Sequence, residues 1–186
     1  TAKPQAMGMR ERGYGRDTRL LVLGQARRPR QTISRGFVKI VNPDYRVSFS
    51  RRSSGRLQLA DWLVAPNNPL TSRVMINRIW HHLFGQGMLK NMDNFGSTGG
   101  DPSHPELLDH LALRFAKNGW SVKGMIREIV LSRTYQLASD YDLANYNADP
   151  DNRYLWRRST RRLDAESIRD SMLSISGLLE QERQRG

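Results

Sequence analysis

The feature that most constrains the fold is a succession of five segments, beginning near Arg56, in which apolar residues recur at the spacing of a helix. Asn68 suits an N-cap and Pro69 the first helical position, whereas Ser103 and Glu106 have the spacing of a capping box. The predicted helices cover residues 55–64, 68–87, 103–119, 121–135 and 162–177. Short loops between amphipathic helices predict a helical bundle-like domain, so the fold class is mainly α, with about five helices.

Further signals mark where the other helices begin and end. Ser54 and Ser121 are available as caps, and Asp164 lies near the start of the last helix. Gly119 and Gly177 follow two of the segments at the point where a glycine commonly ends a helix.

A small β-containing arm precedes the helices. Residues 18–24 and 34–41 read as short strands, with residues 25–32 as the loop between them. Residues 42–54, which contain an Asn-Pro-Asp turn, read as a linker. We therefore predict a basic N-terminal arm over residues 1–55 and a helical domain over residues 56–186, which we expect to be truncated at its C-terminal end.

Basic residues are concentrated in this arm. Residues 1–56 contain fourteen basic and three acidic residues, and so supply +11 of the net charge of +12. Such an excess favours polyanionic partners, namely nucleic acid, an anionic polysaccharide or an acidic protein surface. A basic extension beside a balanced domain is typical of a solvated or partner-covered segment, so we do not expect specific nucleic-acid recognition.

The composition also excludes several kinds of site. The chain has no cysteine, which rules out disulfides, thiol catalysis and cysteine zinc sites within these residues. No apolar run approaches the ~18 residues of a membrane span, so none is expected. The first residue is Thr1 and no charged-then-apolar leader follows it, from which we expect a fragment or a processed product. We predict no cofactor within this chain.

Three long stretches resemble a known family. They are "SGRLQLADWLVAPNNPLTSRVMINRIWHHLFGQGMLKNMDNFGSTGGDPSHPELLDHLA", "NGWSVKGMIREIVLSRTYQLAS" and "DPDNRYLWRRSTRRLDAESIRDSMLSISG". In order and spacing they resemble the domain of unknown function 1553 (DUF1553, or PSD1), and "SRGF" at residues 34–37 is similar to a short motif of the same family. The resemblance covers roughly residues 20–180. Eight polar residues match the family's motifs: Asn68, Arg73, Asn77, Arg78, Arg161, Arg162, Asp164 and Arg169.

The family occurs in large planctomycete-type exported proteins that often carry cytochrome-c-like and carbohydrate-binding-like modules. The resemblance therefore implies a secreted or periplasmic setting, with neighbouring domains of a parent protein as partners. It implies no reaction. Two features depart from the family: members usually continue past the point where this chain ends, and the loop at residues 27–30 is richer in arginine than expected.

His81 and His82 are the first candidates for catalysis, together with Asp164. Because the two histidines are adjacent on a helix, their side chains diverge and do not easily share one metal ion, and the His-Glu-x-x-His pattern of zinc proteases is absent. A metal site would need histidines from different helices plus Asp101 or Asp109. We predict no metal site and interpret the histidines as structural hydrogen-bonding groups.

Arg73, Asn77 and His81 lie four residues apart and form one polar row. Such a row binds backbone carbonyls or carboxylates, either to pin the following loop or the last helix, or to line a binding cleft. Pinning is the preferred interpretation. The glycines of "FGSTGGDP" (residues 95–102) lack the spacing of a nucleotide-binding loop and read as a flexible connection.

The densest ionic cluster spans residues 156–170. Glu166 and Arg169 are three apart and are expected to pair along the helix. Asp164 and its neighbouring arginines, Arg161 and Arg162 among them, favour a structural ion-pair network, with an anion-binding surface or catalysis as alternatives, because arginines depress carboxylate pKa values.

These patterns leave three functional hypotheses. The leading one is a non-enzymatic module of a larger exported protein, which acts as a structural element or binds an anionic ligand or partner. The alternative is a hydrolase-type enzyme or subdomain that acts on polysaccharide and uses His81 or His82 with a carboxylate. The third is charge-driven nucleic-acid binding.

Overall fold

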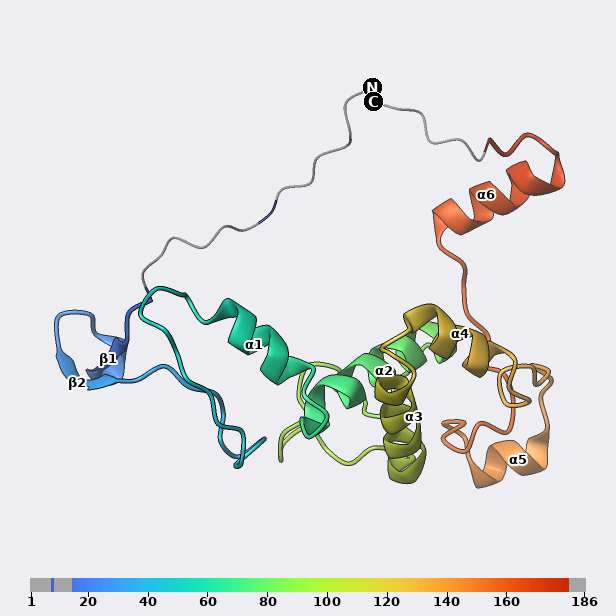
Figure 1. Cartoon of the computed structure of the whole chain (residues 1–186). Helices are drawn as coiled ribbons and strands as arrows, with labels where there is room; N and C mark the ends of the chain where they lie inside the picture. The colour runs from blue at the N-terminus through green and yellow to red at the C-terminus, as the bar shows by residue number, and fades with distance from the viewer. Residues whose placement is uncertain (1–7, 9–14, 181–186) are drawn as a thin grey trace.

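The computed structural model describes residue 8 and residues 15–180. Within this part of the chain there are six α-helices and one two-stranded antiparallel sheet, which confirms a mainly α fold with a small N-terminal β arm (Figure 1). The strands and the 3-10 turn between them are β1 (Thr18–Leu21), η1 (Val22–Gly24) and β2 (Pro29–Ile33). The helices are α1 (Arg56–Leu63), α2 (Pro69–Phe84), α3 (Pro105–Lys117), α4 (Val122–Val130), α5 (Leu143–Ala148) and α6 (Ala165–Ile175).

The core lies where α2 packs against α3 and α4. Its buried residues are Ile76, Ile79, Trp80, Met88, Leu108, Leu111, Ala112, Phe115, Met125 and Ile129. Burying one side chain of the size of Phe115 stabilises the fold by roughly 1.5–3 kcal/mol, so this set is the main source of stability. Trp80 stacks on Phe84 with ring centroids 4.2 Å apart, and Phe84 meets Tyr135 edge to face at 5.5 Å.

Most of the predicted helix signals act as expected. The Asn68 side chain accepts hydrogen bonds from the amides of Leu70 and Thr71, and those of Ser121 and Asp164 cap α4 and α6. The capping box at Ser103 is a wrong prediction. There His104 is the N-cap residue and makes no side-chain cap bond, because the Ser103 hydroxyl lies 2.9 Å from Nδ1 of His104 instead.

Three further details differ from the sequence prediction. Helix α4 ends at Val130 rather than continuing to residue 135. Helix α5, which was not predicted, is a short helix of six residues that begins at the Asp142 cap and contributes no buried residue. Ser54 accepts a hydrogen bond from the amide of Arg56, but the N-cap of α1 is Gly55, in the left-handed conformation at φ 89°.

The predicted second strand and loop are wrong. Residues 34–41 form no strand, and β2 lies at Pro29–Ile33, which overlaps the segment 25–32 that was predicted to be a loop. The short turn between Val22 and Arg28 lets β1 pair with the nearest available segment, and a short loop closes at a lower entropic cost. A proline is tolerated in β2 because both strands lie at an edge.

Residues 34–54 instead fold onto α1 around an aromatic cluster. Phe37 stacks on Trp62 with centroids 5.3 Å apart, and Tyr45 and Phe49 meet Phe37 at 5.9 and 5.6 Å. Arg35 supports the cluster, because its guanidinium donates to the Ser53 carbonyl at 2.7 Å and lies over the Phe49 ring. The predicted linker is therefore packed, and the cluster joins residues from both sides of the predicted boundary at residue 55.

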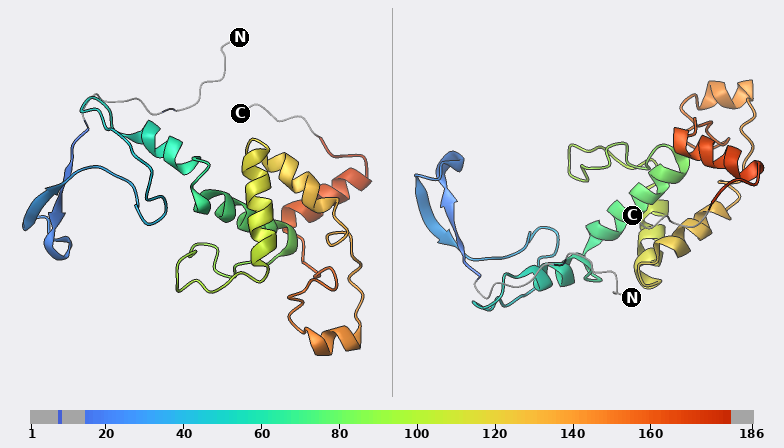
Figure 2. Two further views of the ribbon diagram at one scale, coloured as in Figure 1. Left: turned by 60° about the horizontal axis from the view of Figure 1, so that its bottom comes forward. Right: turned by 90° about the horizontal axis from the view of Figure 1, so that it is seen from above.

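The molecule is extended. The β1–β2 hairpin projects from one end of the molecule. Helix α6 stands apart from the core formed by α2, α3 and α4, to which an irregular segment of the chain connects it (Figures 1 and 2). None of the residues of α6 is buried. Among the described residues, every helix is too short or too polar to span a lipid bilayer.

Candidate functional site

The C-terminal end of α2 brings together some of the polar residues that the sequence singled out, namely His81, His82 and Arg161. Helix α2 begins at the Asn68 cap and ends at Gly85, whose φ of 87° lets its amide donate back to the His81 carbonyl at 2.7 Å. Beyond Gly85 the chain turns along the side of the helix. Met88 and Leu89 are buried there, at 2% and 3% exposure.

Asn77 fixes this returning segment. Its side chain is fully buried and donates to the Leu89 carbonyl at 3.1 Å, while it accepts from the Leu89 amide at 3.0 Å. Gly87 makes this close approach feasible, because a Cβ at that position would lie 2.6 Å from the Leu89 carbonyl and 2.8 Å from Oδ1 of Asn77. The row residue Asn77 therefore acts on the following loop.

Two arginines from the segment after α5 bind the same end of α2. Arg158 donates to the Leu83 carbonyl at 2.7 Å, and Arg161 donates to the His82 carbonyl at 2.6 Å. These carbonyls belong to the last turn, which carries the negative end of the helix dipole, so the cations are favourably placed. The Arg158 guanidinium also lies 3.9 Å from the centroid of the Tyr135 ring.

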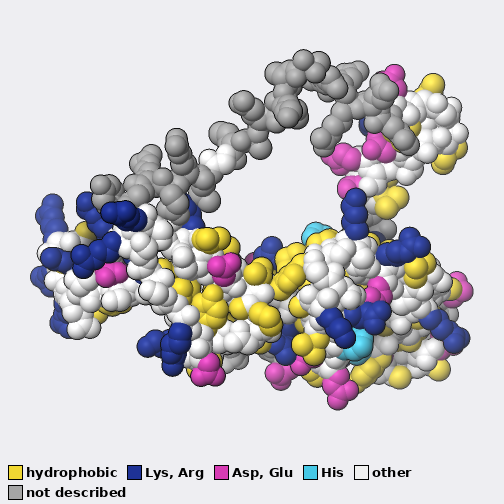
Figure 3. Space-filling view, viewed as in Figure 1, with side chains coloured by type: hydrophobic (Ala, Val, Ile, Leu, Met, Phe, Trp, Pro, Cys, Tyr) yellow, Lys and Arg dark blue, Asp and Glu magenta, His cyan; other side chains and the backbone are white. Residues whose placement is uncertain are grey.

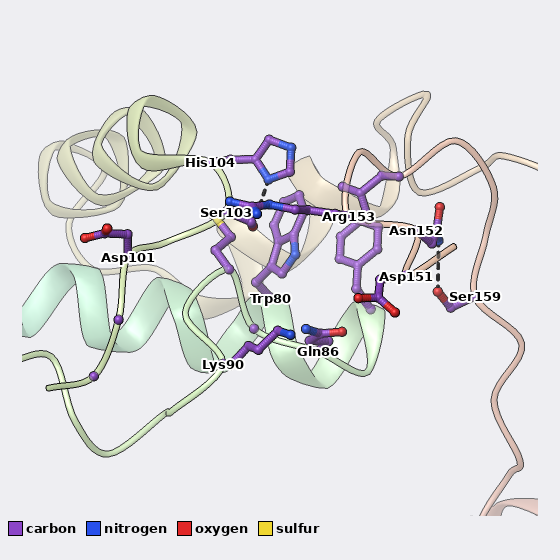
Figure 4. A pocket seen from close by; sticks show the side chains of 16 residues that line it. Trp80, Gln86, Lys90, Asp101, Ser103, His104, Asp151, Asn152, Arg153 and Ser159 are labelled. Carbon is purple, nitrogen blue, oxygen red and sulfur yellow. Dashed lines mark hydrogen bonds between the residues drawn. The ribbon is translucent and has the colours of Figure 1, made fainter. Parts of the chain in front are cut away.

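Between the returning segment, the loop before α3 and the segment after α5 there is a cavity of about 250 Å³ (Figure 4). It is lined by Trp80, Phe84, Gln86, Gly87, Met88, Lys90, Gly99, Gly100, Asp101, Ser103, His104, Asp151, Asn152, Arg153, Leu155 and Ser159. Its floor is apolar and its rim carries charges of both signs, as expected of a small-molecule site.

The wall formed by residues 151–159 has an unusual backbone. Asn152 and Leu155 both have positive φ, at 51° and 56°, in a region that L side chains rarely adopt. The Asn152 side chain holds this turn by donating to the Arg157 carbonyl at 2.9 Å and the Ser159 hydroxyl at 3.1 Å. Backbone strain of this kind is retained where the surrounding structure fixes it, and it often occurs at functional sites.

Ser103 and His104 lie at the rim of the cavity. The Ser103 hydroxyl pairs with Nδ1 of His104 at 2.9 Å, and the Ser103 amide donates to the Met88 carbonyl at 2.8 Å. Among the described residues no carboxylate hydrogen-bonds to this imidazole, so the pair lacks the third member that orients a catalytic histidine. It fastens the loop before α3 to the floor of the cavity.

The structure places the candidate histidines away from this cavity's lining. His81 and His82 have ring centroids 5.7 Å apart and ring planes 80° apart. Neither imidazole hydrogen-bonds to another described residue. The Arg161 side chain donates to the backbone carbonyl of His82, not to its ring. Within residues 15–180 no group of three or more histidine and carboxylate side chains is arranged to hold a metal ion.

Two arginines of α2, Arg73 and Arg78, make ion pairs. Arg73 donates from Nε to Asp109 at 2.6 Å and so links α2 to α3, and this hydrogen bond lowers the pKa of Asp109 and raises that of Arg73. Arg78 pairs with Asp93 at 3.2 Å in an exposed position. Asn68, besides its cap, donates to the Trp62 carbonyl at 3.0 Å.

The predicted ionic cluster does not form one network. The Glu166–Arg169 pair is absent; Arg169 binds Asp170 at 3.0 Å, while Arg162 and Glu166 make no ion pair with other described residues. The arginines at 158 and 161 turn toward α2 instead. Asp164 is exposed, and its pKa is lowered because its carboxylate accepts hydrogen bonds from Ser167 as the cap of α6.

The cavity itself was not predicted. Its residues come from three segments, 80–90, 99–104 and 151–159, and only Trp80 and Phe84 lie on the helix that the sequence singled out. Two signals pointed to its walls. The glycine-rich loop supplies Gly99, Gly100 and Asp101, and the family-like "DPDNRYLW" supplies Asp151 and its neighbours.

The sequence comparisons bear on identity but not on activity. The model of the family described as PSD1, protein of unknown function (DUF1553), matches residues 55–186. No curated protein and no solved structure shows a significant match to the chain. The matched region includes α1 to α6, the hydrogen bonds between Asn77 and Leu89, and the cavity. The chain therefore belongs to the PSD1 (DUF1553) family.

Proposed function

We propose that the chain is a non-enzymatic helical interaction module of a larger exported protein, in the periplasm or outside the cell. The main observation in support is that the β1–β2 hairpin and α6 project from the core and leave large apolar side chains exposed. Leu23 is 91% exposed in the hairpin, and Ile175 is 89% exposed in α6. Soluble proteins rarely expose such surfaces unless a partner covers them.

The hairpin arm has the charge of a docking surface. Residues 15–56 contain eleven basic and two acidic residues, and Lys and Arg gather over the hairpin (Figure 3). Arg19, Arg27, Arg28 and Arg30 form no ion pair with other described residues. Unpaired cations beside exposed leucines fit an acidic protein surface with an apolar centre, or an anionic polysaccharide.

Helix α6 has a second docking surface. Ile168, Met172 and Ile175 recur at helical spacing and are 37%, 67% and 89% exposed. An isolated helix of eleven residues is marginal in water, so its stability depends on packing against another element. Neighbouring domains of the parent protein are the proposed partners, and the role requires no cofactor.

Cross-linking of the natural full-length protein tests this role. Lys39 is the one lysine of the described arm, and Lys117 ends α3 in the core region. We expect Lys39 to cross-link to segments outside these 186 residues, and replacing Arg19, Arg28 and Arg30 together by Glu to reduce those cross-links. Cross-links of Lys117 serve as the control and should be unchanged by the substitutions.

Two results would contradict the proposal. One is that every Lys39 cross-link lies within these 186 residues. The other is turnover of a polysaccharide, ester or phosphoester by the purified chain that is lost in His81→Ala or Asp164→Ala, because that would make the chain an enzyme.

A further inference from the structure

We propose that the cavity over Trp80 binds a single pyranose ring of a carbohydrate. This inference is independent of the interaction role, because it rests on the cavity at the end of α2 and not on the arm or α6. It assigns a small-molecule site to the end of α2 where Asn77 and the arginine clamps fix the surrounding chain.

The floor of the cavity offers an apolar surface with one unused donor. Trp80, Phe84, Met88 and Leu155 line it. Trp80 is only 7% exposed, yet its indole N–H donates to none of the described residues. This N–H keeps some solvent access, in contrast to the fully buried Nε1 of Trp62, so it can donate to an acceptor on a ligand.

The rim surrounds this floor with hydrogen-bonding groups of both signs. Lys90 and Arg153 are cationic, Asp101 and Asp151 are anionic, and Gln86 and His104 add neutral polar groups. Figure 4 shows the Asp101 and Asp151 side chains on opposite sides of Trp80, with the Asp101 carboxylate directed away from it. Two cations are thus balanced by two carboxylates, in a chain that otherwise carries an excess of positive charge.

The ligand class follows from this arrangement. A phosphate or sulfate would face the Asp151 carboxylate, and an apolar ligand would leave the charged groups of the rim without partners. A small zwitterion would engage one cation and one anion and leave the apolar floor uncovered. A pyranose has a ring of hydroxyls that both donate and accept, and a C–H face that covers an aromatic floor, so it satisfies the rim and the floor together.

The volume limits the size of the ligand. At about 250 Å³ the cavity lies just below the ~300–1,000 Å³ range of drug-sized sites, so it holds one ring, and further sugar units would lie outside it. The walls are already in place, because Asn77 holds Leu89, the Ser103 amide holds Met88, and Arg158 holds the last turn of α2. A site formed before binding loses less entropy when it binds.

Proton–nitrogen NMR titration of the purified chain tests the proposal. The probes are methyl glycosides of glucose, galactose, mannose, xylose and N-acetylglucosamine, with sorbitol, glycine and inorganic phosphate as ring-free comparisons. The Trp80 indole N–H signal is identified by its loss in Trp80→Phe. We expect at least one glycoside to move this signal saturably, with Kd of about 10 mM or tighter, and sorbitol to bind at least about tenfold more weakly.

Rim variants then show whether the cavity carries the binding. Asp151→Asn and Arg153→Gln should each weaken it by about fivefold or more, whereas Asp93→Asn, exposed and outside the cavity, should leave Kd unchanged. Unchanged amide spectra elsewhere show that the variants fold. The proposal is overturned if no glycoside shifts the indole signal, if glycine or phosphate binds more tightly than every glycoside, or if the rim variants bind as well as the wild type.

Discussion

The side-chain amide of Asn77 brackets the backbone of Leu89, donating to its carbonyl at 3.1 Å and accepting from its amide at 3.0 Å, with both residues buried. This one contact ties the chain after α2 to the middle of that helix. It satisfies two backbone groups that could not otherwise be buried, and it forms the base on which the cavity is built.

Asn77→Ala should lower the free energy of unfolding by about 2–4 kcal/mol, because two buried hydrogen bonds are lost and the Leu89 amide and carbonyl stay buried without partners. Urea denaturation followed by circular dichroism measures the change. Asn118→Ala is the matched control, since Asn118 is exposed at the end of α3. A loss for Asn77→Ala no greater than that of the control would contradict the assignment.

Gly87→Ala should cost about 1–3 kcal/mol, since its Cβ would be forced to within 3 Å of both Asn77 and the Leu89 carbonyl. The two positions share one contact, so their effects should not add. In Gly87→Ala/Asn77→Ala the total loss is expected to be smaller than the sum of the single losses. Additive losses in the double-mutant cycle would show that Gly87 is required for some other reason.

Arg158→Lys should loosen the segment that forms one wall of the cavity. Lysine keeps the charge but not the planar group that both donates to the Leu83 carbonyl and lies over Tyr135. We expect faster proteolysis within residues 149–161 and a loss of about 1–3 kcal/mol. Arg162→Lys, at an exposed position without an ion pair to other described residues, should change neither; equal effects of the two substitutions would contradict a specific clamp.

The Arg73–Asp109 pair predicts an acid-dependent contribution to stability. Its hydrogen bond lowers the pKa of Asp109 below the ordinary 3.8, so the contribution is present above that value and is lost as the pH falls through the lower folded-state pKa. Because both side chains are partly exposed, Asp109→Asn should cost less than about 1 kcal/mol at pH 7. The difference from wild type should shrink toward pH 2 in denaturation measured across this range; a difference independent of pH would exclude the pair as its source.

The helical part of the fold could be predicted because its signals are local. Asn68, Ser121 and Asp164 each cap a helix within three residues of their own position, and an apolar stripe identifies the buried face of α3. The row of Arg73 and Asn77 was visible for the same reason, since positions four apart share one face of a helix.

The arm and the cavity could not be predicted in this way. Residues 34–41 are rich in residue types that favour strands, but Phe37 packs on Trp62, which is twenty-five residues further along the chain. The wall of the cavity depends on Arg158 reaching Leu83, a contact across seventy-five residues. Periodicity carries no information about such pairs, and the sequence therefore pointed to His81 and His82 although neither lines the cavity.

Amide hydrogen exchange tests the central claim of an interaction module most directly, measured on this chain alone and on the natural full-length protein. In both samples we predict strong protection of α2 and α3, which form the core. The β1–β2 hairpin and α6 should exchange rapidly in the chain alone and become protected in the full-length protein, because neighbouring segments cover them. Rapid exchange of both elements in the full-length protein, or protection equal to that of α2 in the chain alone, would contradict the account.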